Sequence, residues 1–255
     1  MRRRRGAGAR EDPIPRSEFC TGRNEEACQV TTPLVITIDG PAGAGKSTVA
    51  QMLAARLGLT YVDSGATYRA AALKVVKSGV SPDDETAVAG AVSRAEIGFS
   101  TEGLQSAVYL DGRDVSQEIR TSEVTLAAAQ VSRLPEVRQK LIALQRRLVR
   151  GQGVVMEGRD IGTVVFPDAP LKIFLKADVE ERARRRLNQD QQDGRTSTLE
   201  QTAYDIGRRD QLDAERKISP LVPAPDAIEI DSTDLSAEEV VERIVNLARE
   251  RKLLL

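Results

Sequence analysis

Short apolar runs alternate along this chain with longer segments whose apolar residues recur at helical spacing. The runs are typical of buried strands and lie at 34–39 (LVITID), 60–63 (TYVD), 153–157 (GVVME), 171–175 (LKIFL) and 227–231 (AIEID). Helical patterns cover 47–57, 66–77, a segment beginning at Ser81, 122–150 with an interruption near Pro135, and 236–251. Strands separated by helices predict an α/β fold: a five-stranded parallel sheet with helices on both faces. Ligands are then expected at the carboxyl ends of the strands.

Two segments depart from this alternation and are predicted to be insertions on the core. Residues 95–115 alternate apolar and polar positions around the turn signals EG and DG, which predicts a small antiparallel β module. Residues 178–217 are highly charged and helical, and the part at about 182–200 has the polar, glycine-containing character of a mobile lid. We expect one domain, 33–255, that carries both insertions.

Residues 1–32 have mixed charge, two prolines and no sustained apolar period, so we expect a disordered tail. A nucleic-acid-binding arm and a transit peptide are the functional alternatives. Five acidic residues argue against transit, and the lack of an apolar core argues against a secretion signal. The only cysteines, Cys20 and Cys28, fall in this segment and fit neither a zinc ribbon nor a redox pair, which suits a reducing cytoplasm.

Composition narrows the function classes. The 255 residues include 37 basic and 38 acidic side chains, so the formal net charge of −1 gives no general bias toward nucleic acid. Histidine is absent, which excludes histidine triads and histidine zinc sites. Aromatic residues make up only 3% of the chain, which argues against a surface that stacks on nucleic-acid bases. No apolar run is long enough to cross a membrane.

The segment GPAGAGKS fits the pattern G-x-x-x-x-G-K-[ST] in full, between a predicted strand and a predicted helix. Glycines let backbone N–H groups turn toward phosphate oxygens, and the following helix N-terminus adds its positive end. In this pattern the lysine reaches the β- and γ-phosphates and the serine hydroxyl ligates Mg²⁺. We expect a nucleoside triphosphate to bind at Gly40, Pro41, Ala42, Gly43, Ala44, Gly45, Lys46, Ser47 and Thr48.

A carboxylate ends the apolar run VVME. An acidic residue at the end of a strand beside a phosphate loop usually faces the water shell of the metal. Glu157 is therefore a candidate to hold Mg²⁺ through water, and Asp39 is a second carboxylate nearby in sequence. A solvent-exposed strand end is the alternative interpretation of both.

Arginines recur after several different predicted strands, and no guanine-reading N-K-x-D motif of a GTPase is present. Phosphoryl transfer between two polyanions needs such cations, because donor and acceptor phosphates repel and the transition state spreads negative charge. They are Arg69, Arg138, Arg159, Arg182, Arg185, Arg186, Arg209 and Arg216. Three of them, Arg182, Arg185 and Arg186, share one helix face, and a salt-bridged surface helix is the alternative for these.

Several stretches together resemble the bacterial cytidylate (CMP/dCMP) kinases, of the P-loop nucleoside-monophosphate kinase group. They are, in order, ITIDGPAGAGKST, DSGATYR, IRTSEV, PEVR, EGRDIGTVVFPDA, KIFL, ERARRR, RRDQLDAERKISPL and DSTDLS, and they span about residues 34–250. The block GRDIGTVVFPDA in particular separates this family from adenylate and thymidylate kinases. The resemblance implies ATP-dependent phosphorylation of CMP and dCMP with Mg²⁺, a three-stranded insertion at the acceptor and an arginine lid.

The resemblance also implies roles for single residues. Ser64, Tyr68 and Arg69 line the acceptor site, with Arg69 on the CMP phosphate. Arg138 and Asp160 read the cytosine, where Asp160 accepts from the exocyclic amine that uracil lacks. For the remaining residues, Arg159 and Arg216 hold phosphates, Arg209 and Asp213 contact the sugar, and Arg182, Arg185 and Arg186 close over the donor phosphates.

One position departs from the family's pattern. Similar members often carry a serine that touches the cytosine in the helix before PEVR, and its aligned position here is Ala129. Ser132 lies about one helical turn further on. Either Ser132 substitutes for it, or the base loses a hydrogen bond of about 1 kcal/mol, which would relax discrimination against UMP.

Two rival functions follow from the same residues. The first is transfer to another acceptor, such as UMP or a small alcohol like shikimate. The second is a nucleotide-dependent regulatory protein that binds nucleic acid through its arginines, which the even net charge disfavours. For the core we expect small nucleotides as partners, no nucleic acid and no membrane, and we expect a cytoplasmic monomer.

Overall fold

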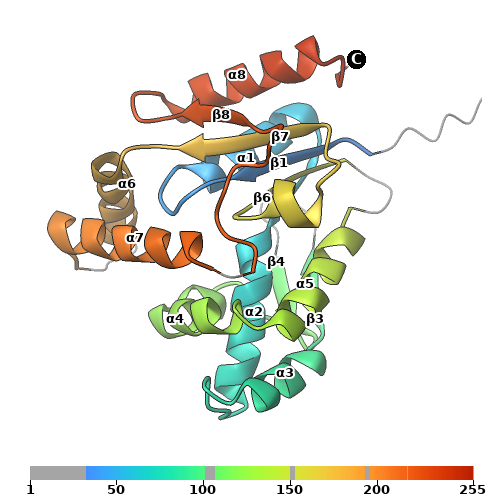
Figure 1. Cartoon of the computed structure of the whole chain (residues 1–255), viewed down its shortest axis with the longest axis vertical. Helices are drawn as coiled ribbons and strands as arrows, with labels where there is room; N and C mark the ends of the chain where they lie inside the picture. Colours follow the sequence, from blue (N-terminus) through green and yellow to red (C-terminus); the bar gives the residue numbers. More distant parts are fainter. Residues whose placement is uncertain (1–32, 101–106, 150–152, 193–195, 217, 255) are drawn as a thin grey trace, which may run out of the picture. The chain divides into compact units, whose positions relative to one another are not determined.

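Five parallel strands form the central sheet of the computed structural model (Figure 1). Their order is β2-β6-β1-β7-β8, with each neighbouring pair parallel. They are β1 (Val35–Asp39), β2 (Thr60–Asp63), β6 (Val154–Gly158), β7 (Leu171–Lys176) and β8 (Ile228–Asp231). The predicted five-stranded parallel sheet is confirmed. Because β1 is central, the loop that follows it has the ends of β6 and β7 on either side.

The structure describes residues 33–100, 107–149, 153–192, 196–216 and 218–254. The predicted disordered tail, 1–32, therefore lies outside the described residues, as do parts of the two predicted insertions. Within the described ranges, no helix is long and apolar enough to cross a membrane.

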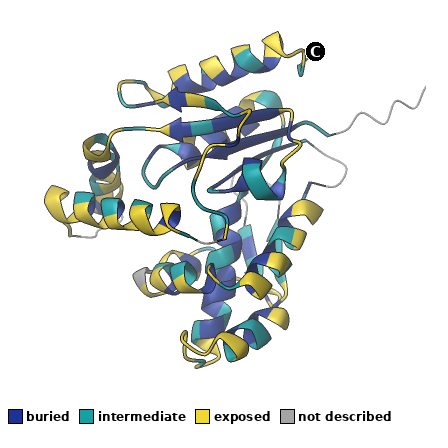
Figure 2. Cartoon of the chain, viewed as in Figure 1, coloured by how far each residue is buried: buried dark blue, intermediate teal, exposed yellow. Residues whose placement is uncertain are grey.

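Different elements cover the two faces of the sheet, whose central strand β1 is buried throughout (Figure 2). On one face Ile36 and Ile38 of β1, both fully buried, pack against α1 (Lys46–Leu57) and α8 (Ala237–Glu250). On the other face Val35 and Met156 pack against a short π-helix, η2 (Ile161–Val165), and residues at the end of α5 (Pro135–Arg147). Because successive side chains of a strand point to opposite faces of the sheet, β1 contributes to the hydrophobic layers on both faces.

A second hydrophobic core lies beyond the sheet. It is built by α2 (Ser64–Lys77), α3 (Glu85–Ser93), α4 (Ser122–Val131), α5, a 3₁₀ turn η1 (Glu118–Arg120) and a three-stranded antiparallel sheet. That sheet has the order β3-β4-β5 and consists of β3 (Ile97–Ser100), β4 (Ala107–Leu110) and β5 (Arg113–Asp114). The predicted antiparallel module between residues 95 and 115 is confirmed. It packs mainly on α2, the helix that carries the DSGATYR motif.

Two local predictions need correction, and one short element was not predicted. α2 begins at Ser64 rather than at residue 66, because the Asp63 carboxylate caps it by accepting from the Ala66 N–H at 3.1 Å. α3 begins at Glu85 rather than at Ser81, because Asp84 rather than the serine caps it. The π-helix η2 was not predicted, since its five residues are too short for a periodic signal.

The charged segment after β7 forms two helices, α6 (Val179–Gln192) and α7 (Leu199–Ala214), which pack against each other. In Figure 1 they lie at the carboxyl ends of the strands, beside the loop between β1 and α1. The predicted site residues lie at strand ends, in the loops after them, at the start of α1, on α2, α5, α6 or α7, or, for Arg216, just after α7. The fold therefore gathers the predicted residues at one edge of the sheet.

Candidate active site

The loop between β1 and α1 has the backbone geometry of a phosphate-binding loop. Gly40 has φ +149°, and a Cβ there would lie 2.0 Å from the Leu175 carbonyl oxygen of β7. Gly43 has φ +78°, and its Cβ would meet the Arg182 backbone oxygen at 2.9 Å. Both positions need glycine, for conformation and for space. The loop is thus held between β7 and α6, and α1 begins directly after it, at Lys46.

Lys46 is buried inside this loop. Its Nζ donates to the Pro41 carbonyl at 2.7 Å, so the ammonium group lies under the turn that the glycines form. Burial, followed by the positive charges of Arg159 and Arg209, lowers the pKa of Lys46 to about 7, although Glu157 and Asp39 oppose the shift. A buried cation that is poorly compensated in this way is suited to an anionic ligand.

The donor set beside the loop fits Mg²⁺. Glu157, at the end of β6, is buried, and its Oε1 accepts from the Tyr61 hydroxyl at 2.7 Å. Burial and then the charge of Asp63 raise the pKa of Glu157, while Lys46 and the Ser47 hydroxyl act against this. No cluster of three or more acidic or cysteine ligands occurs in the described ranges. One hydroxyl and one carboxylate suit an ion that keeps several waters and takes its other ligands from phosphates.

Asp39, the other carboxylate considered for the metal, is engaged elsewhere. Its two oxygens accept from the backbone N–H groups of Ile161 at 2.9 Å and Gly162 at 2.7 Å. Burial raises the pKa of Asp39 to about 6, against the effect of these two hydrogen bonds. Both oxygens are therefore committed to the backbone that follows β6.

On the acceptor side, Arg69 of α2 is held by Asp63, whose Oδ2 accepts from Arg69 Nη2 at 2.6 Å. Although burial opposes ionisation, the Arg69 guanidinium holds the pKa of Asp63 below its usual range. The Nε of Arg69 is buried without a hydrogen-bond partner, which leaves a donor for an anionic ligand. Ser64, at the start of the same helix, is buried, and its hydroxyl lies close to Gly158 at the end of β6.

Arg138 of α5 and Asp160 form a buried ion pair, with 3% and 6% of their surfaces exposed. The Arg138 guanidinium lies 5.6 Å from the ring centroid of Tyr68, and its Nη1 donates to the Ser132 carbonyl at 3.4 Å. The Ser132 hydroxyl donates to the Ala129 carbonyl at 3.0 Å, so it is bonded to its own helix. The structure thus brings Arg138 and Asp160, which the resemblance predicts as base-reading residues, close to Tyr68, which it predicts to line the acceptor site.

Asp213 of α7 joins two of the predicted phosphate-binding arginines. One of its oxygens accepts from Arg159 Nε at 3.0 Å and the other from Arg216 Nη2. The carboxylate is almost fully buried. Both oxygens are shared with guanidinium groups, so Asp213 fixes the positions of these two cations.

Arg209 lies on the surface side of α7 but close to other arginines. Loss of hydration of the guanidinium group beside its neighbours, followed by the charge of Arg159, lowers the pKa of Arg209 to about 10; Arg69 and Arg186 add to this and Asp213 opposes it. Because much of the side chain is exposed to water, we expect it to stay cationic at neutral pH. The four mutually repelling guanidinium groups show that arginines from α2, α6, α7 and the end of β6 converge.

The three predicted lid arginines differ in their surroundings. Arg182 is 5% exposed and donates through Nη1 to the Ala42 carbonyl of the phosphate loop at 3.1 Å, through Nε to the Ala177 carbonyl at 2.9 Å, and to Asp210 of α7. Arg185 donates to the hydroxyl of Ser232, at 3.1 Å, and to its carbonyl, at 2.5 Å, after β8. Arg186 is more exposed and pairs with Asp190 on its own helix.

Sequence reasoning did not single out four residues that support this site. Tyr61 and Asp63 bond to Glu157 and Arg69, Asp210 receives Arg182, and the Ser232 hydroxyl donates to the Ala44 carbonyl at 3.2 Å. Asp63 and Ser232 lie within motifs already noted, DSGATYR and DSTDLS, so a strand-end polar residue inside a motif is the signal that would have found them.

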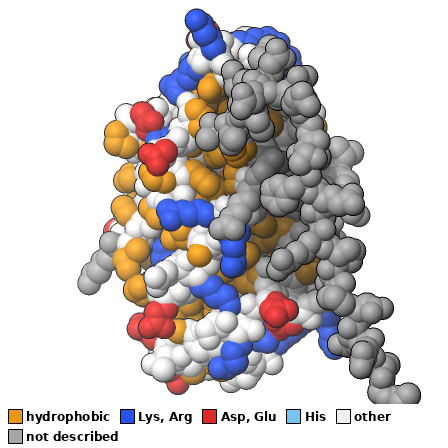
Figure 3. Space-filling model, turned by 90° about the vertical axis from the view of Figure 1, so that its right-hand side faces the viewer, with side chains coloured by type: hydrophobic (Ala, Val, Ile, Leu, Met, Phe, Trp, Pro, Cys, Tyr) orange, Lys and Arg blue, Asp and Glu red, His pale blue; other side chains and the backbone are white. Residues whose placement is uncertain are grey.

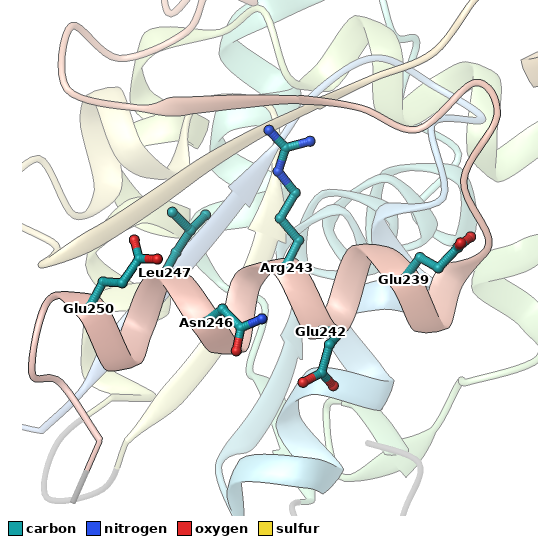
Figure 4. A pocket seen from close by; sticks show the side chains of 6 residues that line it. All are labelled: Glu239, Glu242, Arg243, Asn246, Leu247 and Glu250. Atoms are coloured by element: carbon teal, nitrogen blue, oxygen red, sulfur yellow. The ribbon is translucent and has the colours of Figure 1, made fainter.

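A hollow on the surface of α8 lies apart from the residues predicted for the site. A shallow hollow on α8 is lined by Glu239, Glu242, Arg243, Asn246, Leu247 and Glu250 (Figure 4). All six residues come from one face of one helix, and none of them is a residue that the sequence predicts for binding. On the face shown in Figure 3, basic and acidic side chains are intermingled over the described atoms, in keeping with the balanced charge.

A phosphate loop, a hydroxyl–carboxylate pair for the metal and converging arginines at the edge of a parallel sheet define a P-loop kinase whose acceptor is itself a phosphate. The comparison with known families gives the particular one. The cytidylate kinase family model matches residues 36–250, and the chain belongs to this family.

Curated relatives agree over nearly their whole lengths. The cytidylate kinase of Geobacillus sp. (strain WCH70) is 49% identical over 216 residues, which cover 85% of this chain and 96% of the relative. That of Geobacillus kaustophilus is 50% identical, with the same coverage of 85% and 96%. That of Geobacter sulfurreducens is 44% identical over 219 residues, covering 86% and 94%.

Proposed function

We propose that this chain transfers the γ-phosphoryl group of ATP to CMP and dCMP, giving ADP and CDP or dCDP. The observation that carries the proposal is the buried Arg138–Asp160 pair beside Tyr68. Asp160 lies directly before η2 and directly after Arg159, so the pair that can read a base edge is next to the converging arginines. Family membership supports the same acceptor.

The donor is bound by the phosphate loop. Its N–H groups and the start of α1 surround the β- and γ-phosphates, and Lys46 turns from the Pro41 carbonyl to a phosphate oxygen. Ser47 and Glu157 would hold Mg²⁺, Glu157 through water, and the ion supplies neutralisation of the charge that develops on the transferred group. The closeness of Ser47 and Glu157 supports this assignment.

The acceptor phosphate is bound by Arg69, Arg159 and Arg216. These side chains come from α2 and from the segments after β6 and α7, and their charges offset the repulsion between donor and acceptor. Since the acceptor is a phosphate oxygen, in-line transfer needs no catalytic base. Ser64, Arg209 and Asp213 line the nucleoside part of the site, with Asp213 accepting from a sugar hydroxyl while it keeps the arginines in place.

Asp160 discriminates cytosine from uracil. A carboxylate accepts from the exocyclic amine of cytosine, whereas the carbonyl oxygen of uracil presents an acceptor to it. Arg138 donates to the ring acceptors, and its buried Nε has no hydrogen-bond partner among the described residues. Ala129 brings no hydroxyl and that of Ser132 is directed to its own helix, so we expect weaker discrimination than in members that carry the serine.

Closure of α6 and α7 over both nucleotides would exclude water and suppress hydrolysis of ATP. Arg185 and Arg186 then contact the donor phosphates, whereas Arg182 acts by fixing the phosphate loop to α6 and α7. We also propose that the chain works as a cytoplasmic monomer, since the proposed site is assembled from one chain. Light scattering after size exclusion should then give the mass of a single chain.

The test is release of ADP in a coupled assay with CMP, dCMP, UMP, AMP and dTMP side by side, with ATP saturating. We expect high kcat/KM for CMP and dCMP, and a fall in kcat of about 10³-fold for Lys46→Met, which removes a cation from the transferred phosphate. Turnover of UMP equal to that of CMP would overturn the role of Asp160. Equal ATP consumption with no acceptor present would overturn the kinase assignment.

A further inference from the structure

Asp39 is the last residue of β1, immediately before Gly40 of the phosphate loop, and only 5% of its surface is exposed. In the sheet it lies opposite Gly158, the last residue of β6. Its carboxylate passes beyond that strand end and accepts from the N–H groups of Ile161 and Gly162, at 2.9 and 2.7 Å. These are the two residues that directly follow Asp160.

The same geometry explains why Asp160 is free to face a ligand. Asp160 is the N-cap residue of η2, a place where an aspartate usually turns its carboxylate back to the first helical N–H groups. Here it makes no such bond, and its carboxylate is paired with Arg138 instead. The first two N–H groups of η2 are satisfied by Asp39, from a strand more than a hundred residues away in sequence.

The close packing at this contact requires a glycine. A Cβ on Gly162 would lie 3.0 Å from the Thr37 hydroxyl and 3.4 Å from Asp39 Oδ2. The Thr37 hydroxyl, and Lys172 Cδ at 3.3 Å, would have to move by a few tenths of an ångström to admit it, whereas the distance to Asp39 is that of an ordinary contact. The position of the backbone after Asp160 is therefore determined by Asp39 and by the space beside β1.

From these contacts we infer that Asp39 is a positioning residue for base specificity: by capping η2 in place of Asp160, it directs the Asp160 carboxylate and Arg138 to the acceptor base. The inference rests on the proposed function, in which Asp160 reads cytosine. It also connects the donor and acceptor sites, because the residue that fixes Asp160 is the residue from which the phosphate loop begins.

Asp39→Asn tests the inference. The amide keeps the size of the side chain but replaces one acceptor by a donor, which then opposes the N–H group of Ile161 or Gly162. We expect KM for CMP to rise about tenfold and the preference for CMP over UMP, as a ratio of kcat/KM, to fall about tenfold, roughly the effect of one charged hydrogen bond. KM for ATP should stay within about twofold, since Lys46 and the loop glycines remain in place.

Thr37→Val is the matched control. Thr37 lies two residues earlier on β1, is fully buried, and also borders Gly162, but its hydroxyl has no hydrogen-bond partner. Valine should leave the CMP to UMP preference within about twofold of wild type, because the hydroxyl that it removes makes no hydrogen bond to a described residue. Gly162→Ala, which keeps every carboxylate but crowds the contact, should lower the preference as Asp39→Asn does, and it serves as the test if Asp39→Asn does not fold.

The outcomes are distinct. If wild type phosphorylates CMP and prefers it to UMP, while Asp39→Asn and Gly162→Ala keep that preference, the inference is wrong and the proposed function stands. If wild type does not phosphorylate CMP, the proposed function fails before the variants are compared, and if it phosphorylates CMP and UMP equally, the proposed role of Asp160 fails, and this inference with it. A loss of thermal stability in Asp39→Asn with an unchanged base preference would assign Asp39 a structural role only and overturn the inference.

Discussion

The Tyr61 hydroxyl is one of the groups that hold the Glu157 carboxylate at the end of β6 in place. It donates to Glu157 Oε1 at 2.7 Å, and burial, with the charge of Glu157 adding to it, raises the pKa of Tyr61, so the hydroxyl keeps its proton and acts only as a donor to that oxygen. Groups that hydrogen-bond to a metal-binding carboxylate orient it, and their loss weakens metal affinity.

Tyr61→Phe should therefore raise the Mg²⁺ concentration needed for half-maximal activity by about tenfold, with a smaller change in KM for CMP. Titration of activity with Mg²⁺ at fixed ATP measures this. Tyr204→Phe is the control, since Tyr204 is 65% exposed on α7 and should give the wild-type curve. An unchanged Mg²⁺ requirement in Tyr61→Phe would show that Glu157 does not need this hydroxyl.

The burial of Asp39 also predicts how the stability of the protein changes with pH. Burial raises its pKa from an ordinary 3.8 to about 6, so between these pH values the native state holds a proton that the unfolded chain has lost. Stability therefore decreases as pH rises from about 4 to about 6, by on the order of 2–3 kcal/mol from this group. Asp39→Asn lacks this decrease.

Urea unfolding of wild type, Asp39→Asn and Thr37→Val from pH 4 to pH 7 measures the effect. As pH rises, the unfolding free energy of wild type should fall relative to that of Asp39→Asn. That of Thr37→Val should change with pH as that of wild type does. Three parallel curves would mean that Asp39 ionises at its ordinary pKa, and the proposed effect of burial would be wrong.

Among the secondary-structure elements, the end of α3 is closed by a side chain from another helix. Lys140 of α5 donates from Nζ to the carbonyls of Val92, Ser93 and Ala95, at 2.6, 2.7 and 2.8 Å. These are carbonyls at and just after the last turn of α3, where a cation also interacts favourably with the helix dipole. Partial burial lowers the pKa of Lys140, with Asp111 acting against the shift.

Lys140→Met should lower the free energy of unfolding by on the order of 1–2 kcal/mol, because it leaves three carbonyls to water and separates α3 from α5. Lys77→Met is the comparison. Within the described part of the chain, Lys77 pairs with Glu118 alone, and both side chains are about half exposed, so its loss should cost at most about 0.5 kcal/mol. Denaturant unfolding gives both values, and equal losses would show that the three bonds add nothing beyond a surface pair.

At the scale of the whole molecule, Arg182 connects the phosphate loop, the segment after β7 and α7. Its three kinds of contact, to Ala42, Ala177 and Asp210, join segments that are far apart in the sequence. A change here should therefore be felt at the donor site even though the guanidinium is committed to protein groups rather than aimed at a phosphate.

Arg182→Met should raise KM for ATP about tenfold, since the loop loses its contact to α6 and α7. Arg184→Met is a matched control on the same helix, because the Arg184 side chain is 60% exposed and, of the residues that the structure describes, pairs with Glu181 alone. Initial rates at varied ATP should leave that variant within about twofold of wild type. If both variants behave alike, Arg182 would be no more than a surface arginine in function.

Much of the fold and site follows from local patterns. The five strands, the phosphate loop and the antiparallel module were predicted because a buried strand needs an apolar run and a phosphate turn needs glycine at fixed spacing. The gathering of Arg69, Arg159 and Arg209 was predictable in outline, since the loops after parallel strands meet at one edge. The roles assigned to single residues remain predictions that the proposed experiments test.

The sequence by itself determined the class of fold, the family and the chemical types at the site, because each depends on residues close together in the chain. Only the tertiary structure decided which of those residues are free for a ligand. Asp39 satisfies the N–H groups of η2, Arg182 is enclosed by protein carbonyls and Asp210, and Ser132 is bonded to Ala129. Those assignments depend on strand register and on which helices meet, and the partner of Asp39 lies 122 residues away along the chain. A hydrogen-bonding group has one set of partners in space, and local sequence does not state which.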